Sequence, residues 1–335
     1  MLILFSGYHN PHFVTITEYT ERAIEKLKHS LISFDDRAFI IPGRIRKNVL
    51  FLQNWELNRL NKKLISLALR YKPDYCLVSG GYRILPDTIK KMRDLGIKTV
   101  LWTVDIPLNF QPIVNAAPYY DFVFYGGTEA QELLIKAGAK NVHWLPFACE
   151  PELHRNIHVT SEEKENFGSD VAFVGSFYPN RRQILEKICD LKIKIWGPGW
   201  DKLPPTSPLK KSVKDTKLKP EEWRKIFSSS KIILAIHYQD GKTLCYQASP
   251  KIYEALACKC FLLVDNQKDV RSLFEDGRHL VIFNDIKNLR EKILYYLNHQ
   301  EERKKIAEGG FREVLQKHTY LHRIKKIFSI MEATE

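Results

Sequence analysis

The chain has 335 residues, of which 44% are hydrophobic and 12% aromatic, and this length and composition fit two globular domains better than one. Lysine and arginine number 52 against 39 acidic residues, and the resulting formal net charge of +13 favours anionic partners such as nucleic acid, an acidic membrane surface or phosphorylated small molecules. No apolar run approaches the roughly 20 residues that span a bilayer, so a transmembrane helix is not expected.

Three further features of the sequence narrow the location and the partners that are expected for the protein. Residues 1–7 lack a basic segment and fit a buried strand better than a signal peptide. The six cysteines form no CxxC motif and have no nearby histidine ligand set, so neither a disulfide framework nor a zinc site is expected. The densest basic segment, residues 202–225, lacks interleaved aromatic residues before Trp223, so nucleic-acid binding is not expected. A cytoplasmic location is predicted.

Predicted strands and helices alternate through the first half of the chain. Such alternation indicates a parallel sheet, because successive parallel strands need crossover connections. Strands are predicted at residues 2–6, 37–41, 73–79, 98–104, 121–125 and 141–145, and helices at 15–31, 55–69, 88–95 and 128–137.

The alternation breaks after residue 150, where residues 151–169 are polar and fit an interdomain linker, and it resumes at residue 170. The predicted fold class is therefore α/β, with two facing Rossmann-like doubly wound parallel-sheet domains, residues 1–150 and 170–318, and a cleft between them. Residues 319–335 form a C-terminal helix that is a candidate for packing back on the N-terminal domain. Strands of the second domain are predicted at 170–174, 193–196, 231–236, 260–264 and 279–283, and helices begin near 179, 220, 249, 268 and 285.

Parallel α/β sheets bind ligands beyond the carboxyl ends of their strands, and three loops of the second domain follow strands in this way. They begin at Gly175 and Ser176, at Gly197 and at His237. Gly175 would let a phosphate approach the backbone, Arg181 could neutralise it, and Gly197 could line a nucleobase pocket. The alternatives are a tight turn at Gly175, a solvated helix face at Arg181 and a structural histidine at His237.

The helix that begins at Ser249 is a second candidate for anion binding. Ser249 can cap it, and Pro250 suits its first position, where a missing N–H costs nothing. The helix N-terminus favours an anion such as a phosphate, Lys251 adds a cation, and Glu254 can point a carboxylate toward sugar hydroxyls. The alternative is a capped core helix with lysine and glutamate on its surface.

The same rule applied to the first domain brings together residues 7–12, residues 80–83 and Asp105. A carboxylate at Asp105 could orient a hydroxyl group or remove its proton, and so could His9 or His12. The alternative is that Asp105 caps the turn that follows it.

Segments in both halves of the chain together resemble the sequence motifs of a known protein family. In the second half they are 171–181, 195–200, 249–265, 269–277 and 299–307, and in the first half 73–81, 101–107 and 141–151. Together they resemble glycosyltransferases of the GT-B fold, and most closely the CgeB-like, spore-maturation-type proteins among the relatives of the glycosyl transferases group 1.

The resemblance implies transfer of a sugar from a nucleotide diphosphate donor, with UDP- or dTDP-sugars favoured, to an acceptor hydroxyl. It implies that Glu254 holds the donor ribose and that groups near Gly175 and Lys251 face the diphosphate. Tyr246 stands where many relatives carry the first glutamate of an E-x7-E pair, and a tyrosine cannot act as a carboxylate. The candidate donor-binding residues are thus Gly175, Ser176, Arg181, Gly197, His237, Tyr246, Ser249, Lys251 and Glu254, and the candidate catalytic residues are Asp105 and His9.

The resemblance also implies that neither a bound metal nor another cofactor is needed, since Lys251, an arginine and the helix terminus would offset the diphosphate charge. Retention of configuration is the family's preference. The acceptor is left open as a saccharide, a protein or a cell-envelope component, and peripheral association with an acidic membrane surface fits the charge. Two alternatives stay open: an epimerase or hydrolase of nucleotide-sugars with this fold, and a non-catalytic binding or structural protein.

Overall fold

The computed structural model describes residues 1–105, 110–219 and 221–334, and the chain divides into two compact units. The first unit comprises Met1–Pro146 and the segment from Tyr320 onward, and the second comprises Phe147–Thr319. The end of the 101–107 segment and the predicted helix start at residue 220 lie outside the described residues. Among the described helices, none combines the length and the apolar character that crossing a bilayer requires.

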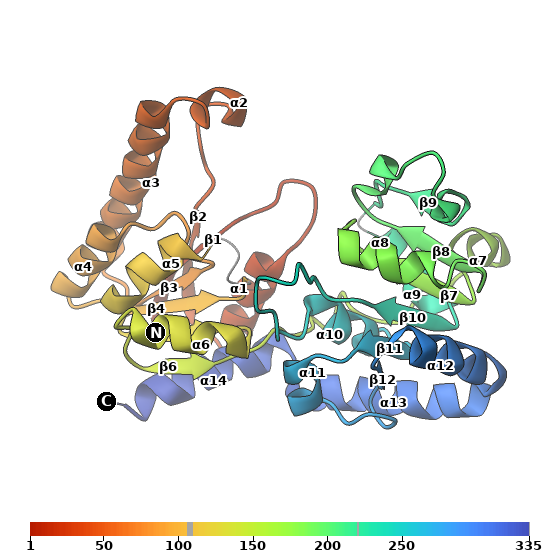
Figure 1. Cartoon of the computed structure of the whole chain (residues 1–335). Coiled ribbons are helices and arrows are strands. Elements are labelled where there is room, and N and C mark those ends of the chain that lie inside the picture. Colours follow the sequence, from red (N-terminus) through yellow and green to blue (C-terminus); the bar gives the residue numbers. More distant parts are fainter. Residues whose placement is uncertain (106–109, 220, 335) are drawn as a thin grey trace. The chain divides into compact units, whose positions relative to one another are not determined.

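The first unit is built on a six-stranded sheet in the order β2-β1-β3-β4-β5-β6, and every pairing in it is parallel (Figure 1). The order reverses between β1 and β3, which is where doubly wound sheets bind ligands. The strands are β1 Leu2–Gly7, β2 Ser30–Asp35, β3 Tyr75–Ser79, β4 Lys98–Thr103, β5 Phe122–Tyr125 and β6 Val142–Trp144.

Helices cover both faces of this sheet. One buried cluster joins one face of the sheet to α3, α4, α5 and α6, while α1 and α14 contact each other, with the rings of Tyr19 and Tyr320 5.1 Å apart. Thr15 and Glu18 form a capping box that fixes the start of α1. The helices are α1 Ile16–Lys26, α2 Gly43–Arg46, α3 Leu50–Tyr71, α4 Pro86–Asp94, α5 Gln111–Ala116, α6 Gln131–Lys136 and α14 Tyr320–Glu332, with single 3-10 turns at Ala117–Tyr119 and Thr128–Ala130.

The second strand was predicted in the wrong place. The structure ends the preceding helix at Lys26 and forms the strand at Ser30–Asp35, whereas residues 37–41 form a loop. This loop packs on a buried carboxylate, because the backbone N–H groups of Ile40 and Ile41 donate to Glu56 at 2.7 and 2.6 Å. The backbone of this apolar segment is therefore held by hydrogen bonds to a buried carboxylate and does not pair with a strand.

The second unit contains another six-stranded parallel sheet, in the order β12-β11-β10-β7-β8-β9. Renumbered within the unit, this is the Rossmann order 3-2-1-4-5-6, and its reversal lies between β7 and β10. The strands are β7 Val171–Val174, β8 Ile193–Trp196, β9 Val213–Asp215, β10 Ile232–Ala235, β11 Leu262–Asp265 and β12 Val281–Phe283.

Both faces of this second sheet are buried. Along β10, Ile233 and Ala235 join a core with α9 and α10, while Ile232 and Leu234 join a core with α8 and α12. Two helical layers around parallel strands confirm the predicted α/β class with two Rossmann-like domains. The helices are α7 Ser161–Phe167, α8 Pro179–Glu186, α9 Glu222–Ser229, α10 Pro250–Ala257, α11 Lys268–Leu273, α12 Ile286–Asn298 and α13 Gln300–Lys317, with 3-10 turns at Trp200–Lys202 and Pro208–Lys211.

Residues 151–169, predicted as a linker, fold as part of the second unit and contain α7. The helix begins with a second capping box, in which the Thr160 hydroxyl accepts from the Glu163 backbone and the Glu163 carboxylate accepts from Thr160. The T-x-x-E spacing of this box was visible in the sequence.

Candidate functional site

The carboxyl edge of the second sheet carries most of the predicted donor-binding residues. Gly175 and Ser176 follow β7, His237 follows β10, and these two strands flank the point where the strand order reverses. Helices α8 and α10 begin close by, at Pro179 and Pro250. The fold therefore places two helix starts and two strand ends at the edge where such sheets bind ligands.

Gly175 lies directly beside two cationic side chains. A Cβ atom on Gly175 would lie 2.8 Å from Lys251 Nζ and 3.5 Å from Arg181 Nη1. Lys251 Nζ also lies 4.4 Å from the centroid of the Phe173 ring, which positions the ammonium. The structure thus brings Gly175, Arg181 and Lys251 together, and the missing side chain of the glycine leaves room for Lys251.

Backbone carbonyls hold Arg181 in place. Its Nε donates to Ile236 O at 2.8 Å and its Nη1 donates to Ser176 O at 2.9 Å, so its planar group is oriented before any ligand arrives. The neighbouring Asn180 donates through Nδ2 to His237 O at 2.8 Å. Asn180 Oδ1 is buried and has no hydrogen-bond partner in the described part of the chain.

The three ionisable groups at this edge have shifted pKa values. Burial lowers the pKa of Lys251 to about 7, and the charge of Arg181 acts in the same direction. Burial raises the pKa of Glu254 to about 7, although the charge of Lys251 opposes this. Burial also lowers the pKa of Arg181. Near neutral pH, the charge facing this edge therefore depends on pH.

Glu254 has a neighbour that was not predicted. His154 Nε2 lies 4.0 Å from Glu254 Oε1, and His154 Nδ1 accepts the backbone N–H of Glu150 at 2.9 Å. The His154 side chain is 1% exposed, and burial together with Arg224 lowers its pKa to about 3. It is a neutral ring whose Nε2–H faces the carboxylate, and no local sequence pattern marks it.

His237 proves to be a structural histidine. Its Nδ1 lies 2.6 Å from Asp265 Oδ1, and its Nε2 accepts the backbone N–H of Ser249 at 3.1 Å. Burial raises the pKa of Asp265, but the interactions with His237 and Gln267 outweigh it and leave the pKa lowered. Ser249 occupies the N-cap position of α10, yet its side chain makes no capping hydrogen bond. The expectation of a serine side-chain cap is therefore wrong, and His237 anchors this helix start.

Gly197 lies against Gly175, whereas Tyr246 contacts residues of α11. Gly197 has φ +130°, and a Cβ there would collide with the carbonyl oxygen of Gly175. Its absent side chain thus lets two strand ends approach each other. The backbone carbonyl of Tyr246 accepts the backbone N–H of Asp269 at 3.1 Å, and the Tyr246 ring lies 5.1 Å from Lys268 Nζ.

The candidate catalytic residues of the first unit do not contact each other. The Tyr82 hydroxyl donates a hydrogen bond to Asp105. Although the Asp105 side chain reaches solvent, surrounding protein desolvates the carboxyl and raises its pKa, and Tyr82, Arg37 and Arg83 oppose this. His9 instead places Nε2 2.8 Å from Glu21 and 3.1 Å from Ser33 Oγ.

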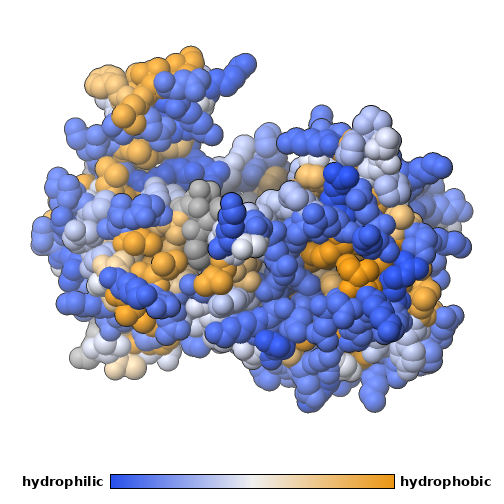
Figure 2. Space-filling view, viewed as in Figure 1, coloured by the Kyte–Doolittle hydropathy of each residue, from blue (hydrophilic) through white to orange (hydrophobic). Residues whose placement is uncertain are grey.

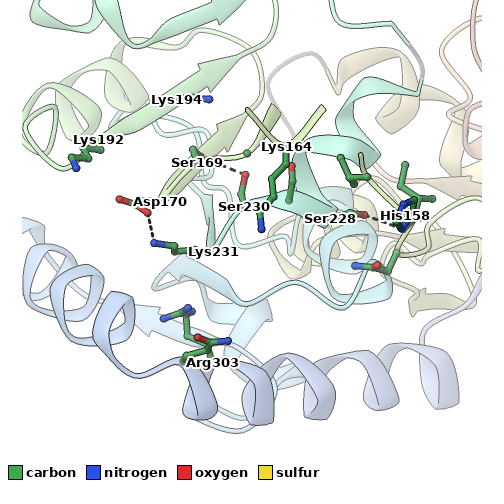
Figure 3. A pocket seen from close by; sticks show the side chains of 16 residues that line it. His158, Lys164, Ser169, Asp170, Lys192, Lys194, Ser228, Ser230, Lys231 and Arg303 are labelled. Carbon is green, nitrogen blue, oxygen red and sulfur yellow. Dashed lines mark hydrogen bonds and ion pairs between the residues drawn. The ribbon is translucent and has the colours of Figure 1, made fainter. Parts of the chain in front are cut away.

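A separate pocket lies at the opposite edge of the second sheet. It has a volume of about 830 Å³, and Figure 3 shows Ser169, Asp170 and Lys231 around it, from the segments that precede β7 and β10. Lys231 forms an ion pair with Asp170 at 2.7 Å. Amino-terminal strand ends are not where such sheets bind ligands, so we do not assign the donor to this pocket.

Among the described residues, no group of three or more His, Cys, Asp or Glu side chains could hold a metal ion. The cations at the carboxyl edge are themselves suited to anion binding. Metal independence stays a prediction.

Comparisons with known proteins agree with this architecture. Residues 181–329 match a family model described as glycosyl transferase-like. Over 263 residues the chain is 22% identical to the spore protein CgeB of Bacillus subtilis (strain 168), covering 75% of this chain and 80% of CgeB. The predicted resemblance to CgeB-like and group 1 glycosyltransferases is confirmed.

Solved structures share the fold along the whole chain. Anabaena HepE in complex with UDP and glucose is similar with a TM-score of 0.67 and 12% identity, covering 99% of this chain and 100% of HepE. Sucrose-phosphate synthase from Thermosynechococcus elongatus is similar with a TM-score of 0.70 and 11% identity, covering 100% of both chains. These likenesses confirm the GT-B fold.

Proposed function

We propose that this protein, a glycosyltransferase of the GT-B fold, binds a UDP- or dTDP-sugar at the carboxyl edge of its second sheet and transfers the sugar to an acceptor hydroxyl bound by its first unit. The observation that carries the proposal is the cluster of Lys251 and Arg181 around the bare backbone of Gly175. The HepE structure that contains UDP-glucose supports the choice of nucleotide.

In this proposal the chain's own groups stabilise the leaving diphosphate. Lys251, Arg181 and the positive end of the α10 dipole would face the negative charge that develops when the glycosidic bond breaks. Because carbonyls already orient Arg181, little reorganisation is needed at that moment. Glu254 would accept hydrogen bonds from the ribose. No metal or other cofactor takes part.

Asp105 is proposed to act on the acceptor hydroxyl. Its raised pKa makes the carboxylate a stronger base than an ordinary aspartate, and Tyr82 fixes its orientation. Asp105→Ala should abolish transfer while UDP still binds. Unchanged transfer in this variant would remove Asp105 from the mechanism. His9, with Nε2 held by Glu21, stays a second candidate through its other ring nitrogen.

A thermal-shift panel with UDP, dTDP and GDP, each in EDTA, tests the donor. A raised melting temperature with UDP or dTDP is expected, and no change with any of the three would contradict the proposal. Incubation with UDP-sugars, followed by product analysis, then separates the alternatives. Donor loss without an acceptor would indicate a hydrolase or an epimerase, and binding without turnover would indicate a binding protein. The anomeric configuration of the product tests the predicted retention.

We also propose that the first unit docks on an acidic membrane surface from the cytoplasmic side. The tip formed by α2 and the start of α3 exposes six large apolar side chains, and Figure 2 shows the hydrophobic surface gathered there. Leu50 and Phe51 are each 74% exposed, and the exposed Arg44 and Lys47 flank them. Apolar groups flanked by cations are typical of peripheral membrane binding. The apolar residues are Ile40, Ile45, Val49, Leu50, Phe51 and Trp55.

Co-sedimentation with phosphatidylcholine vesicles that contain phosphatidylglycerol tests the docking surface. The double variant Leu50→Asp, Phe51→Asp should lose vesicle binding. Leu69→Asp is the matched control, since Leu69 is 54% exposed near the other end of the same helix. Equal binding by the double variant and the control would contradict the proposal.

A further inference from the structure

A cationic cavity of about 450 Å³ lies in the first unit, at the carboxyl ends of β1, β2 and β3. Arg37, Arg46, Lys47 and Arg83 line it. We propose that this cavity binds the phosphate group of a phosphorylated acceptor, so that the acceptor substrate is a phosphate monoester. The inference rests on the proposed function, because it names the acceptor class of that reaction.

The positive charge of the cavity is largely uncompensated. Arg83 has one counter-charge, Asp36, at 3.6 Å. Within residues 1–105, 110–219 and 221–334, no ion pair joins Arg37, Arg46 or Lys47 to a carboxylate. Like charges gathered in this way repel each other, and a bound oxyanion would relieve the repulsion. Four cations against the nearby carboxylates of Asp36 and Asp105 leave a net positive charge, which suits the dianion of a phosphate monoester better than a single carboxylate.

Arg46 is the clearest sign of a built site. Its side chain lines the cavity and is only 7% exposed, and its Nε is buried without a hydrogen-bond partner. Nη1 donates to Gln53 at 2.7 Å, and the guanidinium carbon lies 3.4 Å from the centroid of the Phe39 ring. A buried guanidinium with an unused donor is costly unless something else accepts from it.

Arg37 is oriented in a similar way. Its guanidinium carbon lies 3.8 Å from the centroid of the Tyr8 ring. Two guanidinium groups stacked on aromatic rings lose little freedom when they bind an oxyanion, and their planar forks match phosphate oxygens. The cavity is therefore organised for this ligand before the ligand binds.

The cavity adjoins the proposed acceptor base. Arg37 and Arg83 lie close enough to Asp105 for both charges to lower the pKa of its carboxyl. A phosphate held by these arginines would leave the rest of the same molecule near Asp105, where a hydroxyl could meet the carboxylate. The phosphate would serve as an anchor and would not react.

The pocket in Figure 3 is also basic, but three of its cations already have partners. Lys231 pairs with Asp170, and Lys194 Nζ donates to the carbonyl of Glu165 at 2.9 Å. Arg303 donates to the carbonyls at the end of α12. These three groups serve the fold, whereas Arg46 in the cavity of the first unit keeps a buried Nε without a hydrogen-bond partner.

Titration calorimetry with the full chain tests the inference, with saturating UDP present so that the donor site is filled. Inorganic phosphate and glycerol 3-phosphate are the soluble probes, and phosphatidylcholine vesicles with and without phosphatidic acid are the lipid probe. Arg46→Met and Arg37→Met should each weaken binding at least about tenfold, since each removes a charge-assisted contact. Arg70→Met is the matched control, because Arg70 is an exposed arginine near the other end of α3 and belongs neither to the cavity nor to the docking surface.

Binding of the soluble esters that depends on Arg46 and Arg37 supports a free phosphorylated acceptor. Arginine-dependent binding of phosphatidic acid vesicles alone supports a lipid-borne phosphate. Absence of binding by all of the phosphate probes, or equal affinity in Arg37→Met and the wild type, would overturn the inference even if Arg46→Met fails to fold. UDP affinity is measured on the wild type and on every variant. If the wild type does not bind UDP, the donor proposal fails. If it binds UDP but no phosphate probe, the acceptor inference alone fails.

Discussion

Lys251 gives the account its most demanding prediction, because its charge should control donor affinity near neutral pH. Burial and the neighbouring Arg181 lower the pKa of Lys251 to about 7, while Glu254 and Asp265 oppose the shift. The ammonium is therefore about half protonated at pH 7 in the free protein, and its protonated fraction falls to roughly 0.03 at pH 8.5. A diphosphate that needs this cation must bind more weakly as the pH rises.

The expected loss is about tenfold in UDP affinity between pH 7 and pH 8.5, roughly 1.4 kcal/mol. UDP itself changes in the opposite sense, since its terminal phosphate, with a pKa of about 6, gains negative charge as the pH rises. At pH 8, binding should also take up a proton, as the diphosphate raises the pKa of Lys251 back toward its ordinary range. Calorimetry in two buffers of different ionisation enthalpy measures both the affinity and the proton uptake.

Two variants identify the titrating group. Lys251→Arg keeps its charge across this range, so its UDP affinity should not fall with pH. Glu254→Gln removes the other group that titrates near pH 7, and the pH dependence should persist in it. If the affinity of the wild type is constant from pH 7 to 8.5, or if Lys251→Arg keeps the same dependence, the proposed contact between Lys251 and the diphosphate is refuted.

Three further outcomes follow from single contacts. Gly175→Ala should displace Lys251 Nζ, 2.8 Å from the new methyl group, and weaken UDP binding by about 1 kcal/mol, or roughly fivefold by calorimetry, while the melting temperature changes little. Asp265→Asn should destabilise the fold by about 3 kcal/mol in urea at pH 7, because the buried Asp265 carboxylate accepts charge-assisted hydrogen bonds from His237 and Gln267. The lowered pKa of Asp265 means that its stabilisation is present above the unfolded pKa and lost as the pH falls, so the variant should lose less stability between pH 5 and pH 3 than the wild type. Gly310→Ala should cost about 2 kcal/mol, since its methyl group would collide with the carbonyl oxygen of His279 and with Leu256 of α10, and a urea midpoint equal to that of the wild type would contradict this.

Much of the fold could be predicted from the spacing of apolar residues and from the glycine and proline residues between the elements. Continuous apolar runs such as 232–235 form buried strands, and both sheets are parallel as the alternation indicated. The errors have local causes. The strand at 30–35 was taken partly as the end of a helix, since Lys28, with φ +60°, makes a turn without glycine. The helix at 161–167 was missed although its capping box was legible.

The candidate site was predictable only where backbone topology decides it. The carboxyl-edge rule brought Gly175, Arg181 and Lys251 to one place, and the structure shows them side by side. Side-chain partners decided the rest. The rule could not show that His237 is held by Asp265 and the start of α10, or that His154 faces Glu254, because those contacts join residues far apart in the sequence.

A crystal structure of the full chain with UDP bound, grown in EDTA, tests the central claim most directly. The account predicts the diphosphate at the carboxyl edge of the second sheet, within hydrogen-bond distance of Lys251 Nζ and the first N–H groups of α10, with the ribose on Glu254. UDP at the pocket of Figure 3, or bound without contact to Lys251, would contradict the account.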